Sequence, residues 1–506
     1  MKKFLAAICL GGCLLSACTE DNSTLPHLDI SDIEIAAFQE GGYSIISYSG
    51  NKLELVADVT SGYDESELTY TWYIIDKAKE ESMTWTGSGT YEQEKIGEGK
   101  TLSYEVNLPP GEYTIVCEVK ASNGYTVTKE TTLVTSTNFA SGHYILKETA
   151  DGNTEVDVYN ETDEKLIENV LTAALGQSMT GAPLKMSMCF GHCFINQATN
   201  EMAASNLMTV VTKSGEFKSF NTTDLSVVLE RENLLYNEME ADEYPYAIQS
   251  GMWTNYLFTN KGVRSQNSSM MGLASGKYGV AAGEGASEFI VYSSGSMGVL
   301  YWDENTHSIV TCDYNGGYSQ LNDMATPTSG LTDYECIASG ISNLMSMAYF
   351  LLENKSTGER VLYLVESSFM GTYVYEARTL PTDSHLAQST LFSTSVSSST
   401  YIYGLHDNVV YAYDMNTGNE EALNFAGLPA DETIAYVSNQ YLSRTKDHLV
   451  VGTQKGNDYT LYYYSVLGGK PDGNPVRVVN GQGKVKSMKY TDAGINTFMT
   501  VPPYMD

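Results

Sequence analysis

The chain has 506 residues, of which 29 are lysine or arginine and 62 are aspartate or glutamate, so its formal net charge at pH 7 is -33. This acidic balance argues against nucleic acid as a partner and against charge-driven docking on an anionic lipid surface, because both would repel it. The length is sufficient for two or more domains with a sizeable core.

The first elements in chain order form a targeting segment. Two lysines precede an apolar run, Phe4–Leu15, which has the length of a signal-peptide core and is too short to span a bilayer of roughly 30 Å. Leu15-Ser16-Ala17-Cys18 resembles the bacterial lipobox, whose cysteine is lipidated and becomes the first residue of the mature chain. The alternative is ordinary signal cleavage with an incidental cysteine.

Two acidic residues follow the cysteine closely. Glu20-Asp21 resembles the export signal of Bacteroidetes surface lipoproteins, although the same pair would also suit a solvated linker. We therefore expect a signal peptide over residues 1–17, a lipidated tether over residues 18–27 and an outer-membrane protein that faces the cell exterior. No other window approaches 18 consecutive apolar residues.

Residues 28–136 are predicted to form a small β-sandwich. Leu53–Val59 and Glu112–Lys120 alternate apolar and polar residues, as half-buried strands do, and Leu68–Ile75 carries Trp72 as the expected core anchor. The alternation places Tyr113, Ile115, Cys117 and Val119 on one face. Asn123-Gly124 predicts a hairpin turn into Tyr125–Leu133.

This segment resembles the polycystic-kidney-disease (PKD) type of immunoglobulin-like module. The resemblance is carried by YTWYI at residues 70–74 and by PPGEYTIVCEVKASNGYTVT at residues 109–128. Modules of this type imply spacing or adhesion rather than chemistry.

Residues 137–506 repeat a hairpin pattern of strand, polar turn and strand. Tyr401–Asp414 turns at Asp407-Asn408, and His448–Leu467 turns around Gly456-Asn457. These two units begin 47 residues apart, within the range of a propeller blade. The region is predicted to be a β-propeller, seven-bladed at about 50 residues per blade, with a β-helix or stacked sandwiches as alternatives. Helix signals are few, and Glu161–Leu175 is the best of them.

The arrangement of lipobox, PKD-like module and propeller resembles the PKD-like lipoproteins of Bacteroidetes. Eight residues match the opening of the propeller in that family: Gly142, Tyr144, Leu146, Lys147, Glu148, Gly152, Asn153 and Thr154. The resemblance implies a partner of a TonB-dependent outer-membrane transporter. One branch resembles lipoproteins that capture siderophores made by other bacteria, and others resemble glycan-binding helpers.

No motif for chemistry is present in the sequence. HExxH, GxSxG, a P-loop and a Rossmann fingerprint are all absent, as are the SxDxGxTW boxes of sialidases. MSMCFGHCF at residues 186–194 offers soft metal ligands, but an extended strand would place His192 on the face opposite Cys189 and Cys193. We therefore interpret it as a buried strand, a kink at Gly191 and a second strand. We expect no resident cofactor and no metal site.

Five cysteines remain after the signal peptide and the lipidation site, and an odd number in so long a chain favours buried thiols. Disulfides between Cys312 and Cys336, or between Cys189 and Cys193, stay open at this point.

A binding face over the central channel is the favoured functional site. A sugar or a catecholate needs flat aromatic faces, and an anionic iron chelate also needs cations. The candidate ligand-binding residues are Tyr246, Trp253, Lys261, Arg264, Trp302, Tyr373 and Arg378. Tyr244, Tyr318, Arg360, Arg444 and Lys446 are further candidates.

These features favour a non-enzymatic lipoprotein that captures a ferric siderophore, with iron present only as part of that cargo. The negative charge of the chain opposes an anionic chelate, so a local basic pocket is required, and glycan becomes the preferred ligand if these cations do not meet near the channel. The sequence is also compatible with a propeller hydrolase or lyase that acts on polysaccharide, and with a purely adhesive module.

Overall fold

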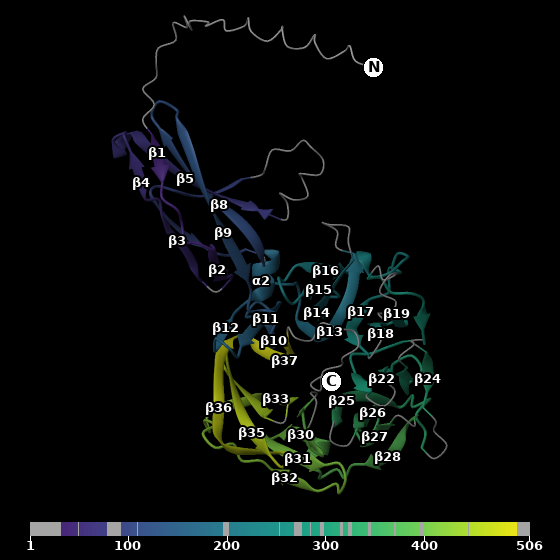
Figure 1. Ribbon diagram of the computed structural model, residues 1–506. Coiled ribbons are helices and arrows are strands. Elements are labelled where there is room, and N and C mark those ends of the chain that lie inside the picture. The colour runs from purple at the N-terminus through teal and green to yellow at the C-terminus, as the bar shows by residue number, and fades with distance from the viewer. Residues whose placement is uncertain are drawn as a thin grey trace, which may run out of the picture. The chain divides into compact units, whose positions relative to one another are not determined.

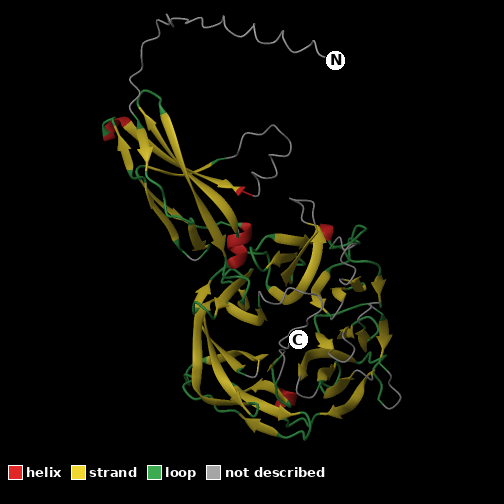
Figure 2. Cartoon of the chain, in the orientation of Figure 1, coloured by secondary structure: helices red, strands yellow, loops and turns green. Residues whose placement is uncertain are grey.

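The computed structural model describes residues 32–492, with gaps at 49, 78–92, 109, 196–201, 252–253, 268–275, 284, 294–297, 314–316, 322–325, 343–345, 369–370, 394–397 and 444. The regular secondary structure of the described part consists almost wholly of strands (Figure 2). It divides into two compact units. The first takes in the described residues up to Tyr43, Lys52–Glu105 and Glu112–Val134, and the second takes in Ser44–Asn51, Val106–Gly111 and the chain from Thr135. No described helix is long and apolar enough to cross a membrane.

The N-terminal strands form antiparallel sheets around a buried tryptophan. The order is β2-β9-β8-β5-β6 in the largest sheet, and β1-β4 and β3-β7 form two smaller ones. These strands are β1 (Ile33–Ile35), β2 (Tyr43–Ile46), β3 (Lys52–Val56), β4 (Val59–Ser61), β5 (Leu68–Asp76), β6 (Glu94–Glu98), β7 (Thr101–Glu105), β8 (Gly111–Ala121) and β9 (Thr126–Ser136). Trp72 is fully buried, and its Nε1 donates to the carbonyl of Gly99 at 2.9 Å.

The predicted pattern of this segment is largely confirmed. The four alternate residues of β8 that were expected on one face, Tyr113, Ile115, Cys117 and Val119, are all buried. Gly124 has φ +92° in the hairpin turn, which glycine adopts without steric cost. The strand expected over Leu53–Val59 is divided, because β3 ends at Val56 and β4 begins at Val59.

The second unit contains seven four-stranded antiparallel sheets among its described residues, arranged in a ring (Figure 1). Six sheets use four consecutive strands each. These are β13 (Pro183–Ile195), β14 (Met202–Thr212), β15 (Phe217–Asn221) and β16 (Val227–Glu230); β17 (Pro245–Ser250), β18 (Thr254–Thr259), β19 (Gly262–Asn267) and β20 (Ala281–Ala282); β21 (Ile290–Ser293), β22 (Gly298–Asp303), β23 (Ser308–Cys312) and β24 (Tyr318–Gln320); β25 (Tyr334–Ser342), β26 (Met347–Asn354), β27 (Arg360–Ser368) and β28 (Gly371–Thr379); β29 (Leu391–Phe392), β30 (Tyr401–His406), β31 (Val409–Asp414) and β32 (Glu420–Ala422); and β33 (Thr433–Ser443), β34 (Lys446–Lys455), β35 (Asp458–Leu467) and β36 (Lys470–Gln482).

The seventh sheet joins the two ends of the ring. Its order is β12-β11-β10-β37, from β10 (Gly142–Glu148), β11 (Thr154–Asn160), β12 (Lys165–Ile167) and β37 (Lys484–Thr491). The ladder between β10 and β37 runs from Gly142 opposite Thr491 to Glu148 opposite Lys484. In Figure 1 the yellow β37 lies beside the blue-teal β10. This pairing makes β37 the innermost strand of the seventh sheet and joins the last strand of the propeller to its first sheet.

Apolar side chains fill the space between neighbouring sheets. Every residue of β22 and β23 is buried, because each middle strand is covered on both faces by the adjacent sheets. One such cluster combines Trp302 and Ile309 with Phe350 of the following sheet. The cores therefore lie between sheets, and the innermost strand of each sheet faces the centre of the ring: the first strand in six sheets and β37 in the seventh.

Several of the residues that match the propeller opening of the PKD-like lipoproteins have structural roles. The Tyr144 hydroxyl donates to the carbonyl of Phe139 at 2.5 Å, and Thr154 Oγ1 donates to the carbonyl of Gly181 at 2.7 Å. Lys147 is buried and forms an ion pair with Asp157 at 2.6 Å. At Gly142 a Cβ would lie 2.7 Å from the carbonyl oxygen of Tyr159, so no larger residue fits there without a shift.

The helix expected over Glu161–Leu175 is wrong for its first half. Asn160 Oδ1 accepts from the backbone N–H groups of Thr162 and Asp163, a local turn that competes with helix formation. The helix α2 is confined to Val170–Leu175, and the buried Glu155 carboxylate accepts from the backbone N–H groups of its first turn at 2.8 and 3.1 Å. A second short helix, α3 (His385–Gln388), precedes β29.

Candidate functional site

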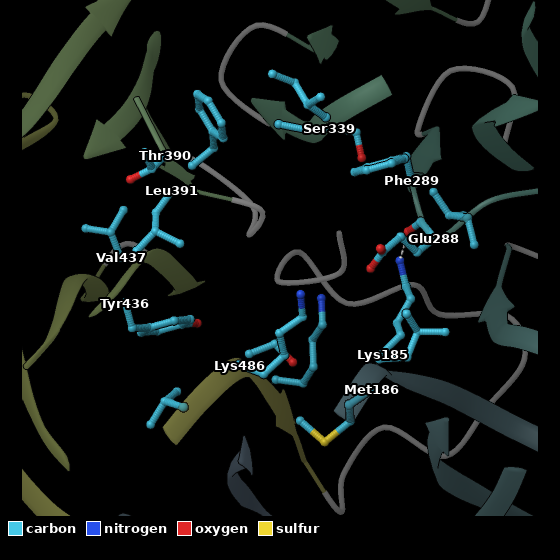
Figure 3. A pocket seen from close by; sticks show the side chains of 18 of the residues that line it. Lys185, Met186, Glu288, Phe289, Ser339, Thr390, Leu391, Tyr436, Val437 and Lys486 are labelled. Atoms are coloured by element: carbon cyan, nitrogen blue, oxygen red, sulfur yellow. Dashed lines mark hydrogen bonds between the residues drawn. The ribbon is translucent and has the colours of Figure 1, made fainter. Parts of the chain in front are cut away.

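A cavity of about 320 Å³ lies at the end of the central channel where the inner strands begin. Six inner strands, or the residues just before them, supply its lining: β13, β21, β25, β29, β33 and β37. Figure 3 shows these side chains pointing inward from around the ring. A volume near 300 Å³ is at the lower end of the range for small-molecule sites.

The charges of this cavity oppose the charge of the whole chain. Its lining contains Lys185, Lys486 and Lys489 and a single carboxylate, Glu288, so the formal charge of the lining is +2. The Lys185 ammonium donates to the backbone carbonyl of Glu288, and Lys486 extends into the cavity from the other wall (Figure 3). A cluster of cations in a chain of net charge -33 creates a local site for an anion.

Apolar and hydroxyl groups complete the lining. Phe289 and Tyr436 present aromatic rings from different sheets (Figure 3), and Phe392 also lines the cavity. Ser487 lines the cavity too, and among the described residues its buried Oγ has no hydrogen-bond partner. The site therefore combines cations and flat apolar surfaces with a buried serine hydroxyl in its wall.

A β-bulge in the last strand places Lys486. Leu146 pairs with Ser487 and Lys147 pairs with Val485, so Lys486 is an extra residue without an opposite partner. Bulges of this kind bend the strand and redirect a side chain. The position of Lys486 toward the channel thus depends on a local irregularity that strict alternation along the strand does not predict.

The cations expected to bind ligand are instead paired with carboxylates elsewhere in the sheets. Arg264 forms hydrogen bonds at 3.0 Å to both carboxylate oxygens of the buried Glu243, and Lys261 lies 2.6 Å from Asp242. Arg378 donates to both Glu376 oxygens and to the hydroxyl of Tyr413. None of these three cations lines the cavity.

Arg360 and Lys446, two further candidate cations that the structure describes, are also paired with carboxylates. Arg360 contacts Glu353 at 2.7 Å and the carbonyl of Ser389 at 2.8 Å. Lys446 lies 2.6 Å from Glu161, which also accepts from Arg477 at 2.8 Å. Arg444 is outside the described residues. The structure therefore does not bring the predicted cations together at the channel, and three other lysines, Lys185, Lys486 and Lys489, line the cavity there.

The aromatic candidates are dispersed. Trp302 is 2% exposed in the core between two sheets, where no ligand reaches it. Tyr246 is partly buried against Tyr244, with ring centroids 5.4 Å apart. Tyr373 is exposed on β28, and its hydroxyl donates to Glu366 at 2.6 Å. Trp253 and the lipidation candidate Cys18 lie outside the described residues.

The segment Met186–Phe194 forms one strand with a bulge at Gly191. Cys189 pairs with Leu207 and His192 with Ser205, so three steps along β13 match two along β14, and the side-chain alternation is reversed. His192 Nδ1 lies 4.0 Å from Cys189 Sγ, which corrects the expectation that these side chains occupy opposite faces. Burial lowers the pKa of His192 to about 4.

The same region shows no metal-binding arrangement. Within the described residues, no three His, Cys, Asp or Glu side chains gather as metal ligands. The cysteines Cys189, Cys193, Cys312 and Cys336 are buried free thiols, so neither of the two disulfides left open by the sequence is formed.

One sequence signal does point to the channel lysines. GKVKSMKY at residues 483–490 contains three lysines in eight residues, in a chain with more than twice as many acidic as basic residues. The spacing of these lysines does not by itself show which of them faces the channel, because that depends on the bulge.

Comparisons with known proteins agree with this architecture. Residues 18–183 match the model of the PKD-like family, a span that extends beyond the sandwich strands to the beginning of β13. The fold is similar to that of a quinonprotein alcohol dehydrogenase-like protein from Bacteroides thetaiotaomicron, with 13% identity, a TM-score of 0.53 and coverage of 92% of this chain and 100% of that one. The dihydro-heme d1 dehydrogenase NirN (10% identity, TM-score 0.40, 70% and 76% coverage) and the Dos1 propeller (11%, 0.37, 71% and 95%) are more distant. No curated protein sequence matches. The chain is thus an all-β protein in which a PKD-type β-sandwich is followed by a β-propeller.

Proposed function

We propose that this protein is a lipid-anchored capture protein of the outer membrane that binds a small anionic ligand in the channel cavity. The observation that supports this proposal is the reversal of charge at the cavity, where three lysines and one glutamate line a site in a strongly acidic chain. Cations in a partly enclosed site attract an anion more strongly than the same groups on an open surface.

The cations selected from the sequence do not meet at the channel, which alone would favour a glycan, but Lys185, Lys486 and Lys489 line the cavity in their place, so we keep a ferric siderophore as the preferred ligand. A chelate with a charge of about -3 would be repelled by the surface as a whole, and screening over about 8 Å limits that repulsion to the nearest acids. The channel lysines supply the basic pocket that such a ligand requires, and the rings of Phe289, Phe392 and Tyr436 offer apolar surface to its organic part.

The rest of the function follows from the targeting segment and the family resemblance. Lipidation at Cys18 would hold the protein at the outer membrane, facing outward. The captured ligand would pass unchanged to a TonB-dependent transporter. We assign no bond-breaking role to the cavity, whose wall carries one carboxylate and no histidine among its described residues.

Calorimetry on the mature chain tests the proposal, with ferric enterobactin and a panel of neutral glycans as probes. We expect ferric enterobactin to bind, and Lys486→Gln to weaken its binding about tenfold, the equivalent of about 1.4 kcal/mol. Lys261→Gln removes the same charge beside Asp242, outside the cavity lining, and is expected to leave the affinity unchanged.

Two results would change the proposal. Binding of a neutral glycan without binding of the chelate would replace the siderophore by a saccharide as the ligand. Equal affinities for the chelate in the wild-type protein and in the Lys486→Gln variant would remove the channel from the proposal.

A further inference from the structure

The strand that closes the ring also carries most of the positive charge of the cavity. Lys486 and Lys489 both lie on β37, whereas Lys185 lies on β13, the inner strand of the next sheet. Among the described strands, β37 has β10 as its single neighbour in the sheet. The ladder to β10 therefore holds two of the three lysines at the channel.

The two sides of this ladder differ in their charge environment. On β10, Lys147 is buried and paired with Asp157, which also accepts from the hydroxyl of Tyr459 on β35 at 2.7 Å. On β37, the bulged Lys486 is exposed and extends into the cavity that Lys185 also lines (Figure 3). The charge of Lys147 is compensated within the fold, while the charge of Lys486 faces a lining of net positive charge.

Like charges in one cavity oppose the pairing of the strand that carries them, and a bound anion relieves that opposition. On this basis, we infer that anion binding and ring closure are coupled: an anion held between Lys486 of β37 and Lys185 of β13 stabilises the pairing of β37 with β10. This inference rests on the proposed function, because it places the ligand in the same cavity. It adds that the bound ligand links β37 to β13, the inner strand of the next sheet.

The coupling has a measurable size. An anion that binds the closed ring alone lowers the population in which β37 is open by a factor of 1 + [L]/Kd, about 100-fold at 100 times Kd. In the neutral variant Lys486→Gln, the pairing of β37 with β10 should be tighter without ligand. A bound anion should then stabilise that pairing less than it does in the wild type.

Hydrogen exchange followed by mass spectrometry on the full mature chain measures both effects. The reporters are the amides of Gly142–Glu148 and Lys484–Thr491, and the reference is β26 with β27 in a distant sheet. Without ligand, Lys486→Gln is expected to slow exchange at the two reporter segments severalfold. The matched control is Lys484→Gln, on the same strand but 65% exposed beside Glu148, which should not slow it.

Ferric enterobactin is the probe for the second effect, and its binding is measured by calorimetry in the same buffer. Saturation with ferric enterobactin should slow exchange at the reporter segments more than at β26 and β27. This ligand-induced slowing should be smaller in Lys486→Gln than in the wild type. Binding without selective protection would overturn the coupling while leaving the capture function in place. Absence of binding would overturn the proposed function, and unchanged or faster exchange in unliganded Lys486→Gln would overturn the repulsion on which the coupling depends.

Discussion

At the scale of single residues, the buried ion pair between Lys147 of β10 and Asp157 of β11 lies within the sheet that closes the ring. The two side chains are 2% and 0% exposed, and Asp157 also accepts from the backbone N–H of Asn169 at 2.8 Å. A buried carboxylate that loses its cation is left uncompensated in a medium of low dielectric constant.

We therefore expect Lys147→Met to lower the free energy of unfolding by about 3–5 kcal/mol. Urea denaturation followed by circular dichroism measures the change. Lys455→Met removes an exposed lysine 4.0 Å from Asp431 and should stay within about 0.5 kcal/mol of the wild type. A loss below about 1 kcal/mol for Lys147→Met would show that the pair contributes little.

A buried histidine on β34, His448, makes the stability of the protein dependent on pH. Burial and the charge of Arg477 lower the pKa of His448 from 6.5 to about 4. The unfolded chain therefore binds this proton at a higher pH than the folded chain, and stability falls as the pH falls below 6.5.

Through His448 alone, the free energy of unfolding is expected to fall by about 2 kcal/mol between pH 8 and pH 5. His448→Gln removes the proton site in both states and should reduce the pH dependence by that amount. Chemical denaturation at pH 8, 6.5 and 5 gives the comparison. Parallel pH profiles for the wild type and the variant would refute the assignment.

At the scale of elements, the hairpin turns explain why the repeats could be recognised. Asp407 and Asn408, between β30 and β31, have φ +49° and +62°, the left-handed pair that two-residue hairpin turns require. Asn408 also accepts from the backbone N–H of Ile434 at 2.7 Å, so it connects its turn to the next sheet.

Asn408→Val should therefore destabilise the protein by about 2–3 kcal/mol, through backbone strain and the lost hydrogen bond. Asp407→Gly serves as the comparison, because glycine accepts a positive φ and the Asp407 side chain is 86% exposed. That variant should be at least as stable as the wild type. Thermal unfolding ranks the two, and equal melting temperatures would contradict the role of the turn.

At the scale of the whole molecule, the ring depends on one strand that comes from the end of the chain. Tyr144, Leu146 and Met488 are buried at this seam, and among the described strands β10 has no other partner on that side. Removal of β37 would take Met488 out of the buried cluster that it shares with Ile145 and would leave the inner edge of β10 unpaired.

A chain that ends at Gln482 is accordingly expected to lose the cooperative thermal transition of the propeller and to aggregate on heating. Differential scanning calorimetry and light scattering follow the two effects. Retention of a transition of wild-type enthalpy in the shortened chain would show that the ring is stable without its closing strand.

The sequence alone determined the class of the fold and many of its turns. Alternation along residues 112–120 and the aspartate, asparagine and glycine of the hairpins depend on neighbours in the chain, so these local rules were sufficient to predict them. The start of α2 was missed because it depends on the carboxylate of Glu155, which lies in a preceding strand.

Only the tertiary structure decided which cations line the channel cavity. Arg264 and Arg378 were reasonable candidates in sequence, but folding places carboxylates beside them and so neutralises their charge locally. Lys185 and Lys486 lie about 300 positions apart and come to one cavity because the ring closes between the two ends of the propeller. A bulge of one residue then turns Lys486 toward the channel. The alternation of side chains along a regular strand does not predict this change of register.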